Sequence, residues 1–371
     1  MNEYEKAECW KNCSPEQWDD WKWQIKNRIK SGEQLSKVIK LRVGEKEEID
    51  ECLKHFNMAI TPYYASLIQA DNPQCPIKKQ AVPTIAELTV DPCDMADPLC
   101  EEKFSPVPGL VHRYPDRVLV VLTHKCSMYC RHCTRRRVVG CEDFSLGSAQ
   151  LNAVISYIRE HTVIRDVLLS GGDPLVMSDD WLENIIRKLR DIPHVEVIRI
   201  GTRTPVVLPM RITDGLLNML KKYHPIWINT HFNHPVEITP ESVKACQKIA
   251  DAGIPLGNQS VLLEGVNNNV DTLKELFTKL VKMRVRPYYL YQCDVSKGIG
   301  HFRTNVAQGI DIMKHIRGYI SGFAVPEYVI DAPGGGGKTP VNPEYIVKMD
   351  DSGVTLRNYE GKTYFYPNPP R

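Results

Sequence analysis

The sequence predicts an α/β protein whose centre is a partial barrel of six strand–helix units. From Arg117 onward, short runs rich in β-branched residues alternate with amphipathic segments. Parallel strands joined by crossover helices produce this alternation. Polar motifs recur where the runs end, as they do in barrels whose sites lie at the C-terminal ends of the strands. Six units are fewer than a closed barrel contains, so we expect an open or partial one.

The segment before the barrel carries helical signals over residues 1 to about 60. Ser14-Pro15-Glu16-Gln17 is typical of a helix cap and first turn, and residues 31–41 show a similar pattern. The tryptophans that follow the first cap fit a core or a subunit interface better than a cofactor site. Residues 61–110 are rich in proline and aspartate with little periodicity, which predicts an extended arm wrapped around the main domain.

The expected elements and domains follow from these patterns. The predicted strands are 117–123, 165–170, 195–200, 226–231, 256–262 and 285–291, and the predicted helices lie near 147–161, 178–190, 213–223, 240–252, 269–283 and 304–318. We expect three segments, namely a helical segment with its arm over 1–110, the barrel over 111–332, and a glycine-rich loop with a short C-terminal β extension over 333–371.

Composition excludes several classes of protein. The chain has 371 residues, of which 42% are hydrophobic and 25% charged, and its formal net charge of +2 offers no basic surface for nucleic acid or membrane. No apolar run approaches the roughly 20 residues that cross a bilayer. The polar start MNEYEKAECWKNC has no apolar core of a secretory signal. Twelve cysteines in such a chain predict a reducing, cytoplasmic setting in which clustered thiols bind metal.

One such cluster follows the first predicted strand. Cys126, Cys130 and Cys133 are spaced C-x3-C-x2-C. Three thiolates on a four-iron cluster leave one iron open to a small chelating molecule, whereas a structural zinc site or a regular iron–sulfur carrier wants a fourth protein ligand. The alternatives are buried structural cysteines or half of a zinc site whose fourth ligand lies elsewhere. The open-iron arrangement would define an active site.

Five polar motifs are expected at one face of the barrel, because each lies at or just past the C-terminal end of a predicted strand. Among them, adjacent glycines such as Gly171 and Gly172 let the backbone come close to a ligand, although a plain strand-to-helix turn would look the same. The motifs are Ser170-Gly171-Gly172-Asp173, Gly201-Thr202-Arg203, Thr230-His231-Phe232-Asn233, Asn258-Gln259-Ser260 and Tyr291-Gln292-Cys293-Asp294.

A second cofactor signal lies in the glycine run that carries Lys338. It is not a phosphate-binding loop of the Walker type, because Pro340 prevents the helix that should follow. A lysine on a glycine tether instead suits an imine with a carbonyl cofactor such as pyridoxal phosphate. Arg113 and Arg117, with Tyr114 between them, offer two cations for its phosphate, unless the three residues are a solvated surface.

Taken together, the motifs HRYPDR, CSMYCRHCTRRR, LLSGGDPL, RIGTRTPVVLP, NTHFNHP, PLGNQSVLL, VRPYYLYQCD and DAPGGGGKTPV closely resemble those of the lysine 2,3-aminomutase family, from about residue 55 to 366. The cysteine motif and the fold resemble those of radical S-adenosylmethionine (SAM) enzymes in general. The resemblance implies a radical-SAM partial barrel that uses a [4Fe-4S] cluster, S-adenosyl-L-methionine and pyridoxal 5'-phosphate. It also implies exchange of the α-amino group of an amino acid with a β-hydrogen.

Carried over by motif, the resemblance assigns roles to residues of this chain. Cys126, Cys130 and Cys133 would hold the cluster, and Lys338 would bond to pyridoxal phosphate. Further cofactor contacts are implied at Arg113, Tyr114, Arg117, Ser170, Gly171, Gly172, Asp173, Arg203, His231 and Gln259. Asp173 stands where glutamate is commoner in radical SAM enzymes.

The substrate residues implied are Arg135 for the carboxylate, Asp294 and Asp331 for a side-chain ammonium, and Tyr291 beside them. Two acids would repel the side chain of glutamate, so L-lysine is the expected substrate, with arginine and glutamate as alternatives. Other readings are a radical SAM enzyme that modifies a protein lysine and a plain iron–sulfur electron carrier.

Expected partners follow from the same resemblance. A reductant such as flavodoxin or ferredoxin must supply the electron, and a homo-oligomer is expected. No structural zinc is expected, because Asn267-Asn268-Asn269 stands where longer family members carry a cysteine, and no cysteine follows Cys293.

Overall fold

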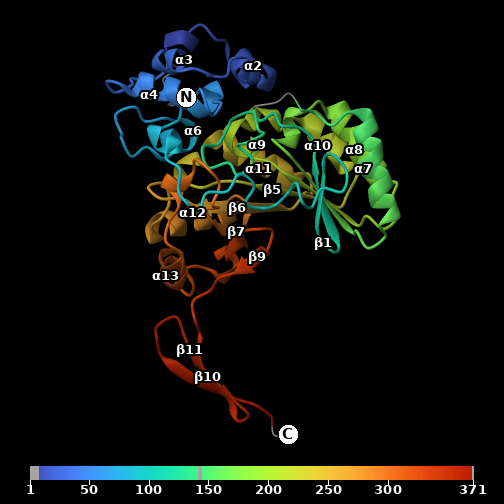
Figure 1. Ribbon diagram of the computed structural model, residues 1–371, viewed down its shortest axis with the longest axis vertical. Helices are drawn as coiled ribbons and strands as arrows, with labels where there is room; N and C mark the ends of the chain where they lie inside the picture. The colour runs from blue at the N-terminus through green and yellow to red at the C-terminus, as the bar shows by residue number, and fades with distance from the viewer. Residues whose placement is uncertain (1–7, 141–143, 370–371) are drawn as a thin grey trace.

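The computed structural model describes residues 8–140 and 144–369. Figure 1 shows the N-terminal helices at one end, a curled sheet with its helices in the middle, and a narrow β extension that projects from the other end. The chain therefore has the partial barrel, the helical arm and the β extension that the sequence predicts.

The central sheet has nine strands in sequence order. Strands β2 to β8 run parallel, and β1 and β9 pair antiparallel at the two edges. Alternate side chains of β2, β3 and β4, such as Val120, Leu169 and Ile200, are fully buried, as expected for strands covered by helices. The strands are β1 Leu110–Tyr114, β2 Arg117–Val121, β3 Asp166–Ser170, β4 Val197–Gly201, β5 Ile226–Thr230, β6 Leu256–Leu262, β7 Arg286–Gln292, β8 Glu327–Ala332 and β9 Gly337–Pro340.

Six long helices follow the six predicted strands. Most begin at a side-chain cap, as at Ser178, Thr213, Thr239 and Asn269. All six predicted strands and helices are confirmed within a few residues. The helices are α7 Ser148–Glu160, α8 Asp179–Arg190, α10 Asp214–Lys221, α11 Pro240–Asp251, α12 Val270–Lys282 and α13 Val306–Ile316, with the short α9 Thr204–Val207 between β4 and α10.

The sheet is nevertheless larger than six strands. Sequence patterns miss β1, β8 and β9, because none of the three begins a strand–helix unit of its own. The Asn258-Gln259-Ser260 motif also lies inside β6 rather than at its end, so that expectation is wrong in detail.

The N-terminal arm is built from short helices rather than extended chain. Ser14 caps α1 in the predicted capping box, where Gln17 and Ser14 exchange two hydrogen bonds of 3.2 Å. The prediction of an extended arm over 61–110 is wrong in part, because proline starts two helices there at the first helical position. The arm helices are α1 Pro15–Asp19, α2 Trp21–Lys26, α3 Gly32–Ser36, α4 Glu45–Cys52, α5 Pro62–Ala65, α6 Pro76–Ala81 and the 3-10 helix η2 Ile85–Leu88.

The two edges of the curled sheet meet through side chains. Arg113 at the end of β1 donates to Asp331 of β8 at 2.7 Å, and the backbone N–H of Lys338 in β9 donates to the Tyr114 hydroxyl at 3.0 Å. These residues are more than 200 positions apart in the chain. The sheet therefore curls far enough for its first and last strands to touch.

The C-terminal extension is a separate three-stranded sheet of β10 Ile346–Asp350, β11 Gly353–Arg357 and β12 Thr363–Pro367. Directly paired residues share a face, so Ile346, Leu356 and Tyr364 lie on one face, as do Met349, Val354 and Tyr366. Five of these six side chains are classed as exposed. The extension, seen in red in Figure 1, thus presents one apolar face to its surroundings.

A search of the described residues for membrane spans finds no helix that combines the length and the apolar character a crossing needs.

Candidate active site

The cysteine loop follows β2 and is held by the N-terminal arm. Backbone N–H groups of Tyr129 and Arg131 donate to the carbonyls of Ala59 and Gln80, each at 3.0 Å. Arg28 donates to the Cys126 carbonyl at 2.5 Å. Because most of the loop's anchors come from residues 28–87, the arm helps to set the loop's shape.

The three cysteines of the loop are half-buried, and their thiols act on one another's pKa values. Burial raises the pKa of Cys126 well above its usual value, and Asp173 and the other two thiols raise it further. Burial and Cys130 raise the pKa of Cys133 to about 11. Thiolates in this position repel one another unless a cationic group lies among them. A thiolate-bound iron cluster meets that requirement, so the donor set fits one.

The glycines after β3 pack against the cysteine loop. A Cβ at Gly172 would stand 2.2 Å from the Lys125 carbonyl oxygen, and one at Gly171, whose φ is +135°, would stand 2.4 Å from that of Thr123. The sequence predicts that the backbone comes close to a ligand here. In the structure the two glycines come close to the backbone of the cysteine loop. Only glycine lets the two loops meet.

Asp173 is engaged on both oxygens. Oδ1 accepts from Thr202 Oγ1 at 2.6 Å and from the Leu175 N–H, and Oδ2 accepts from the Arg203 N–H at 2.9 Å. Its carboxylate therefore ties the glycine turn to the end of β4.

The ends of β4 and β5 lie behind the cysteine loop. Arg203 Nη1 is 2.8 Å from Cys130 Sγ. Burial and the charge of Arg203 lower the pKa of His231 to about 3, so its ring is neutral. Among the described residues, His231 Nε2 and Thr230 Oγ1 are buried without a hydrogen-bond partner, which leaves polar atoms for a bound molecule. Gln259 lies half-buried on β6.

Arg135 lies beside the same turn and pairs with Glu101, an arm residue that no sequence motif indicates. Its Nε donates to both carboxylate oxygens of Glu101 at 2.9 Å, and Nη1 reaches the Ser170 hydroxyl at 3.2 Å and the Gly171 carbonyl at 3.3 Å. Hydrogen bonds to the Glu101 carboxylate on one side and to the glycine turn on the other fix the direction of the Arg135 guanidinium.

Lys338 lies on strand β9, not on a free glycine tether as the sequence predicts. Its Nζ is 2.9 Å from Asp331 Oδ2, and its register partner on β8 is the same Asp331. Arg113 occupies the other oxygen at 2.7 Å. Burial would raise the pKa of Asp331, but the charges and hydrogen bonds of Lys338 and Arg113 lower it. The amine is one-third exposed, so it is open to a carbonyl compound.

Tyr114 links the two arginines expected at the phosphate. The guanidiniums of Arg113 and Arg117 lie 4.9 and 4.1 Å from its ring centroid. Arg117 also pairs with the exposed Asp116 at 2.9 Å. This cation-rich patch lies directly beside Lys338 and fits an anionic group next to the lysine.

Asp294 faces Lys338 and Asp331 without a partner of its own. No hydrogen bond or ion pair to its carboxylate is found among the described residues. Burial, with Asp331 nearby, raises its pKa to about 7, against the opposing charges of Lys338 and Arg113. The Tyr291 ring centroid lies 5.5 Å from Lys338 Nζ. Among the described residues, the pocket thus holds one acid with two charged partners, Asp331, and one acid without an ion pair, Asp294.

A continuous series of charges joins the cysteine loop to Lys338. Cys133 and Cys126 act on the pKa of Arg135, which pairs with Glu101, and Arg113 in turn acts on the pKa of Glu101. Arg113 then shares Asp331 with Lys338. The structure therefore brings the two predicted cofactor motifs into one region.

Sequence reasoning missed the acids that hold the loop's arginines. Glu87 binds Arg131 and Arg136, and Glu237 binds Arg203. The residues of all three pairs lie more than 30 positions apart in the chain, so no local pattern signals them.

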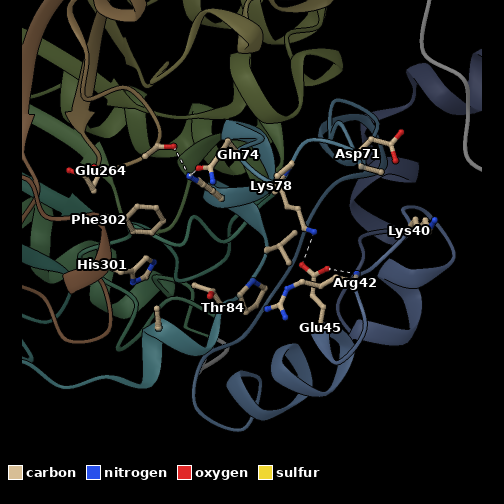
Figure 2. Close-up of a pocket in the computed structure, with 17 residues that line it drawn as sticks. Lys40, Arg42, Glu45, Asp71, Gln74, Lys78, Thr84, Glu264, His301 and Phe302 are labelled. Carbon is tan, nitrogen blue, oxygen red and sulfur yellow. Dashed lines mark hydrogen bonds and ion pairs between the residues drawn. The ribbon is translucent and has the colours of Figure 1, made fainter.

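Two further features lie away from this region. A cavity of about 660 Å³ opens between the arm and the loop at Gly265, where Lys78 pairs with Glu45 at 2.6 Å and Lys79 reaches the Gly265 carbonyl at 2.9 Å. Figure 2 shows Lys78 and Glu45 on its wall, joined by a dashed line. Asp91, Cys93 and Asp94 have metal-ligand spacing, but Arg303 binds all three.

Comparison with known proteins first identifies the class of protein to which the chain belongs. The family model of the radical SAM superfamily matches residues 120–277, which span the cysteine loop and strands β2 to β6. Among solved structures, SuiB of Streptococcus suis bound to S-adenosylmethionine aligns with 59% of this chain and 51% of its own at 13% identity and a TM-score of 0.46. Membership of the superfamily implies a four-iron cluster and S-adenosylmethionine.

The particular family follows from the C-terminal model and the relatives. A model described as lysine-2,3-aminomutase matches residues 313–371. The chain is 59% identical to L-lysine 2,3-aminomutase of Clostridium subterminale over 98% of its length and 87% of the relative's. It is 50% identical to glutamate 2,3-aminomutase of Clostridioides difficile over 95% of its length and 83% of the relative's. The chain belongs to the lysine 2,3-aminomutase family, whose members are isomerases that also depend on pyridoxal phosphate.

Replacing Gly172 tests the contact between the two loops. Gly172→Ala forces a Cβ into the Lys125 carbonyl, so we expect a loss of about 1–3 kcal/mol in the free energy of unfolding and a lower iron content after anaerobic reconstitution. Gly215→Ala is the control, because its Cβ would meet nothing closer than 3.8 Å. Wild-type stability and iron content in Gly172→Ala would contradict the packing described here.

Proposed function

We propose that this chain is an L-lysine 2,3-aminomutase, which interconverts L-lysine and β-lysine. The observation that carries the proposal is the position of the protein's own lysine. The Lys338 ammonium is bound at Asp331 with the unpaired Asp294 beside it. An acid pair that holds one alkylammonium is suited to hold another of the same chemistry.

The cluster, S-adenosylmethionine and pyridoxal phosphate supply, when bound, a carbon radical and a carbonyl that carries the migrating nitrogen. In our proposal Cys126, Cys130 and Cys133 bind the cluster through their thiolates. The glycine turn from Ser170 to Asp173, together with Arg203, His231 and Gln259, borders the S-adenosylmethionine site. The unpartnered polar atoms of Thr230 and His231 support this assignment.

Lys338 is the proposed residue that bonds to pyridoxal phosphate, with Arg113, Tyr114 and Arg117 around the phosphate. When Lys338 turns from Asp331 toward the cofactor, Asp331 loses its ammonium partner. Asp331 and Asp294 then share one pocket in which Arg113 is the remaining cation. The pocket therefore has an excess of negative charge. A substrate ammonium entering there replaces the charge that has left.

In the proposed site, a cationic side chain binds one end of the substrate and two acidic side chains bind the other. Arg135 is the proposed partner of the α-carboxylate, since Glu101 fixes its guanidinium beside the glycine turn. Asp294 and Asp331, with Tyr291 beside them, are the proposed partners of the distant ammonium. Glutamate, the substrate named for one relative, would place a carboxylate against these acids, which is unfavourable.

Partners and organisation complete the proposal. A radical SAM enzyme needs a reductant, which we propose is flavodoxin or ferredoxin. The division into an arm (1–110), a barrel (111–332) and a C-terminal segment (333–371) is proposed as the functional one. A cytoplasmic location, and the absence of nucleic-acid and membrane partners, stay predictions.

We also propose a homo-oligomer. Its support is the apolar face of the C-terminal sheet, where Tyr364 and Tyr366 are 55% and 65% exposed. A three-stranded sheet of this size gains little stability unless such a face is buried. A second copy of the chain would provide the cover.

The reaction is tested by an amino-acid panel. The anaerobically reconstituted enzyme, supplied with S-adenosylmethionine and a reductant, should convert L-lysine to an isomer of equal mass and different chromatographic retention. Lys338→Ala should abolish product and also the spectral signature of bound pyridoxal phosphate, and Cys130→Ala should abolish S-adenosylmethionine cleavage. Turnover of glutamate or arginine in place of lysine would refute the substrate assignment.

The acid pair predicts a pH dependence of lysine binding. Burial and Asp331 raise the pKa of Asp294 to about 7 while Lys338, whose charge lowers it, remains at Asp331. When Lys338 bonds to the cofactor that lowering charge is lost, so the carboxylate is already losing charge as the pH falls through 7, and lysine affinity should drop by up to about tenfold per pH unit. Titration calorimetry of the pyridoxal-phosphate-loaded enzyme between pH 6 and 8 measures this.

Asp294→Asn should bind lysine weakly at all these pH values, whereas the exposed Asp311→Asn should match the wild type. An unchanged pH profile in Asp294→Asn would show that another group titrates.

The oligomer is tested at the apolar face. Tyr364→Ser/Tyr366→Ser should lower the mass measured by analytical ultracentrifugation, because it removes aromatic area from the face. Phe365→Ser is the matched control, since Phe365 is 58% exposed on the opposite face. Equal masses for all three proteins would exclude this face as the interface.

A further inference from the structure

Arg203 lies at the end of β4, where it touches several of the site's motifs at once. Its side chain is buried, and its Nη1 donates to Cys130 Sγ at 2.8 Å. Nη2 donates to Gln80 at 2.6 Å and to Glu237 at 2.7 Å, and Nε donates to the His231 carbonyl at 3.2 Å. The guanidinium therefore has a partner on each of its nitrogens.

Glu237 is the residue that fixes this guanidinium. Its side chain is fully buried, and it accepts hydrogen bonds from the Tyr64 hydroxyl at 2.7 Å and the Asn233 N–H at 2.6 Å. With Arg203 these donors saturate the carboxylate. The ion pair has no freedom to rotate, so the direction of Nη1 toward Cys130 is set by the fold.

The charge of Arg203 persists despite its burial. An arginine side chain stays protonated in folded proteins, because its pKa lies far above the physiological range. A charged donor in a region of low dielectric interacts strongly with the sulfur it faces. Cys130 therefore accepts a hydrogen bond directly from a cationic side chain.

We propose that Arg203 sets the reduction potential of the iron–sulfur cluster by donating a hydrogen bond to the Cys130 thiolate, with Glu237 as its positioning partner. The inference rests on the proposed role of Cys130 as a cluster ligand. The one-electron-reduced cluster carries an additional negative charge, so a cationic donor stabilises the reduced state more than the oxidised state. Hydrogen bonds to cluster sulfurs are known determinants of such potentials. Arg203 accordingly makes the cluster easier to reduce.

The test is a potentiometric titration monitored by electron paramagnetic resonance, on anaerobically reconstituted protein without S-adenosylmethionine. Arg203→Gln/Glu237→Gln removes both members of the ion pair, which avoids a lone buried carboxylate. At a fixed solution potential, the ratio of reduced to oxidised cluster should fall at least about tenfold, equal to about 59 mV for one electron.

Arg211→Gln is the matched control. Arg211 is equally buried and follows the same strand, but it donates to the Leu175 carbonyl at 2.6 Å and to Asp179 at 2.5 Å. Its loss should reduce the free energy of unfolding and leave the potential unchanged. A purely structural role for Arg203 predicts the same pattern in both variants.

The outcomes distinguish a failure of the inference about Arg203 from a failure of the proposed cluster assignment. A wild-type potential in Arg203→Gln/Glu237→Gln overturns the inference. Arg203→Met/Glu237→Met decides the case if the first double variant holds no iron, because it removes the same charged donor with apolar side chains of similar length, and it too should lower the potential. A wild-type potential in that variant would overturn the inference. Full iron content in Cys130→Ala would instead overturn the cluster assignment.

Discussion

The Asp331 carboxylate is the contact on which the site depends, because it joins the first and the last strands of the curled sheet. It accepts from Arg113 of β1 and from Lys338 of β9. A single carboxylate with two cations is electrostatically satisfied, and its low pKa keeps it ionised. Without it, the sheet edges would carry two cations, the partly buried Arg113 and the more exposed Lys338, facing each other. The lysine and the cation-rich patch are therefore neighbours through the same contact that closes the sheet.

A second group of ion pairs gives the cysteine loop its shape. Arg131 and Arg136 meet on Glu87, and Arg135 meets Glu101, so that arm carboxylates fix guanidiniums of the loop. Buried ion pairs of this kind add little net stability, because desolvation offsets their attraction. They do exclude other loop conformations, because any rearrangement would leave a charge unpaired. The arm thus contributes to the site through geometry although it supplies none of the proposed ligands.

The sequence predicted the repeated part of the fold well and the closing contacts poorly. Alternating apolar runs located six of the seven parallel strands and the helices that follow them, because those patterns are local and periodic. The edge strands β1 and β9 carry no such period, and their pairing depends on Tyr114 meeting a residue more than 200 positions away. Motifs likewise located Cys126 to Cys133 and Lys338. They could not show that Lys338 lies on a strand, or that Glu237 and Glu87 lie behind the loop, because those placements arise from tertiary packing.

The two pocket acids have environments that push their pKa values in opposite directions, and this difference explains their roles in our proposal. Asp331 is paired and its pKa is lowered, whereas Asp294 is unpaired and its pKa is about 7. An unpaired buried carboxylate costs free energy that an incoming cation recovers. In our proposal Lys338 occupies Asp331 only until pyridoxal phosphate is bound. Its transfer to the cofactor would leave the two acids with an excess of negative charge, which favours the ammonium of lysine over an acidic side chain.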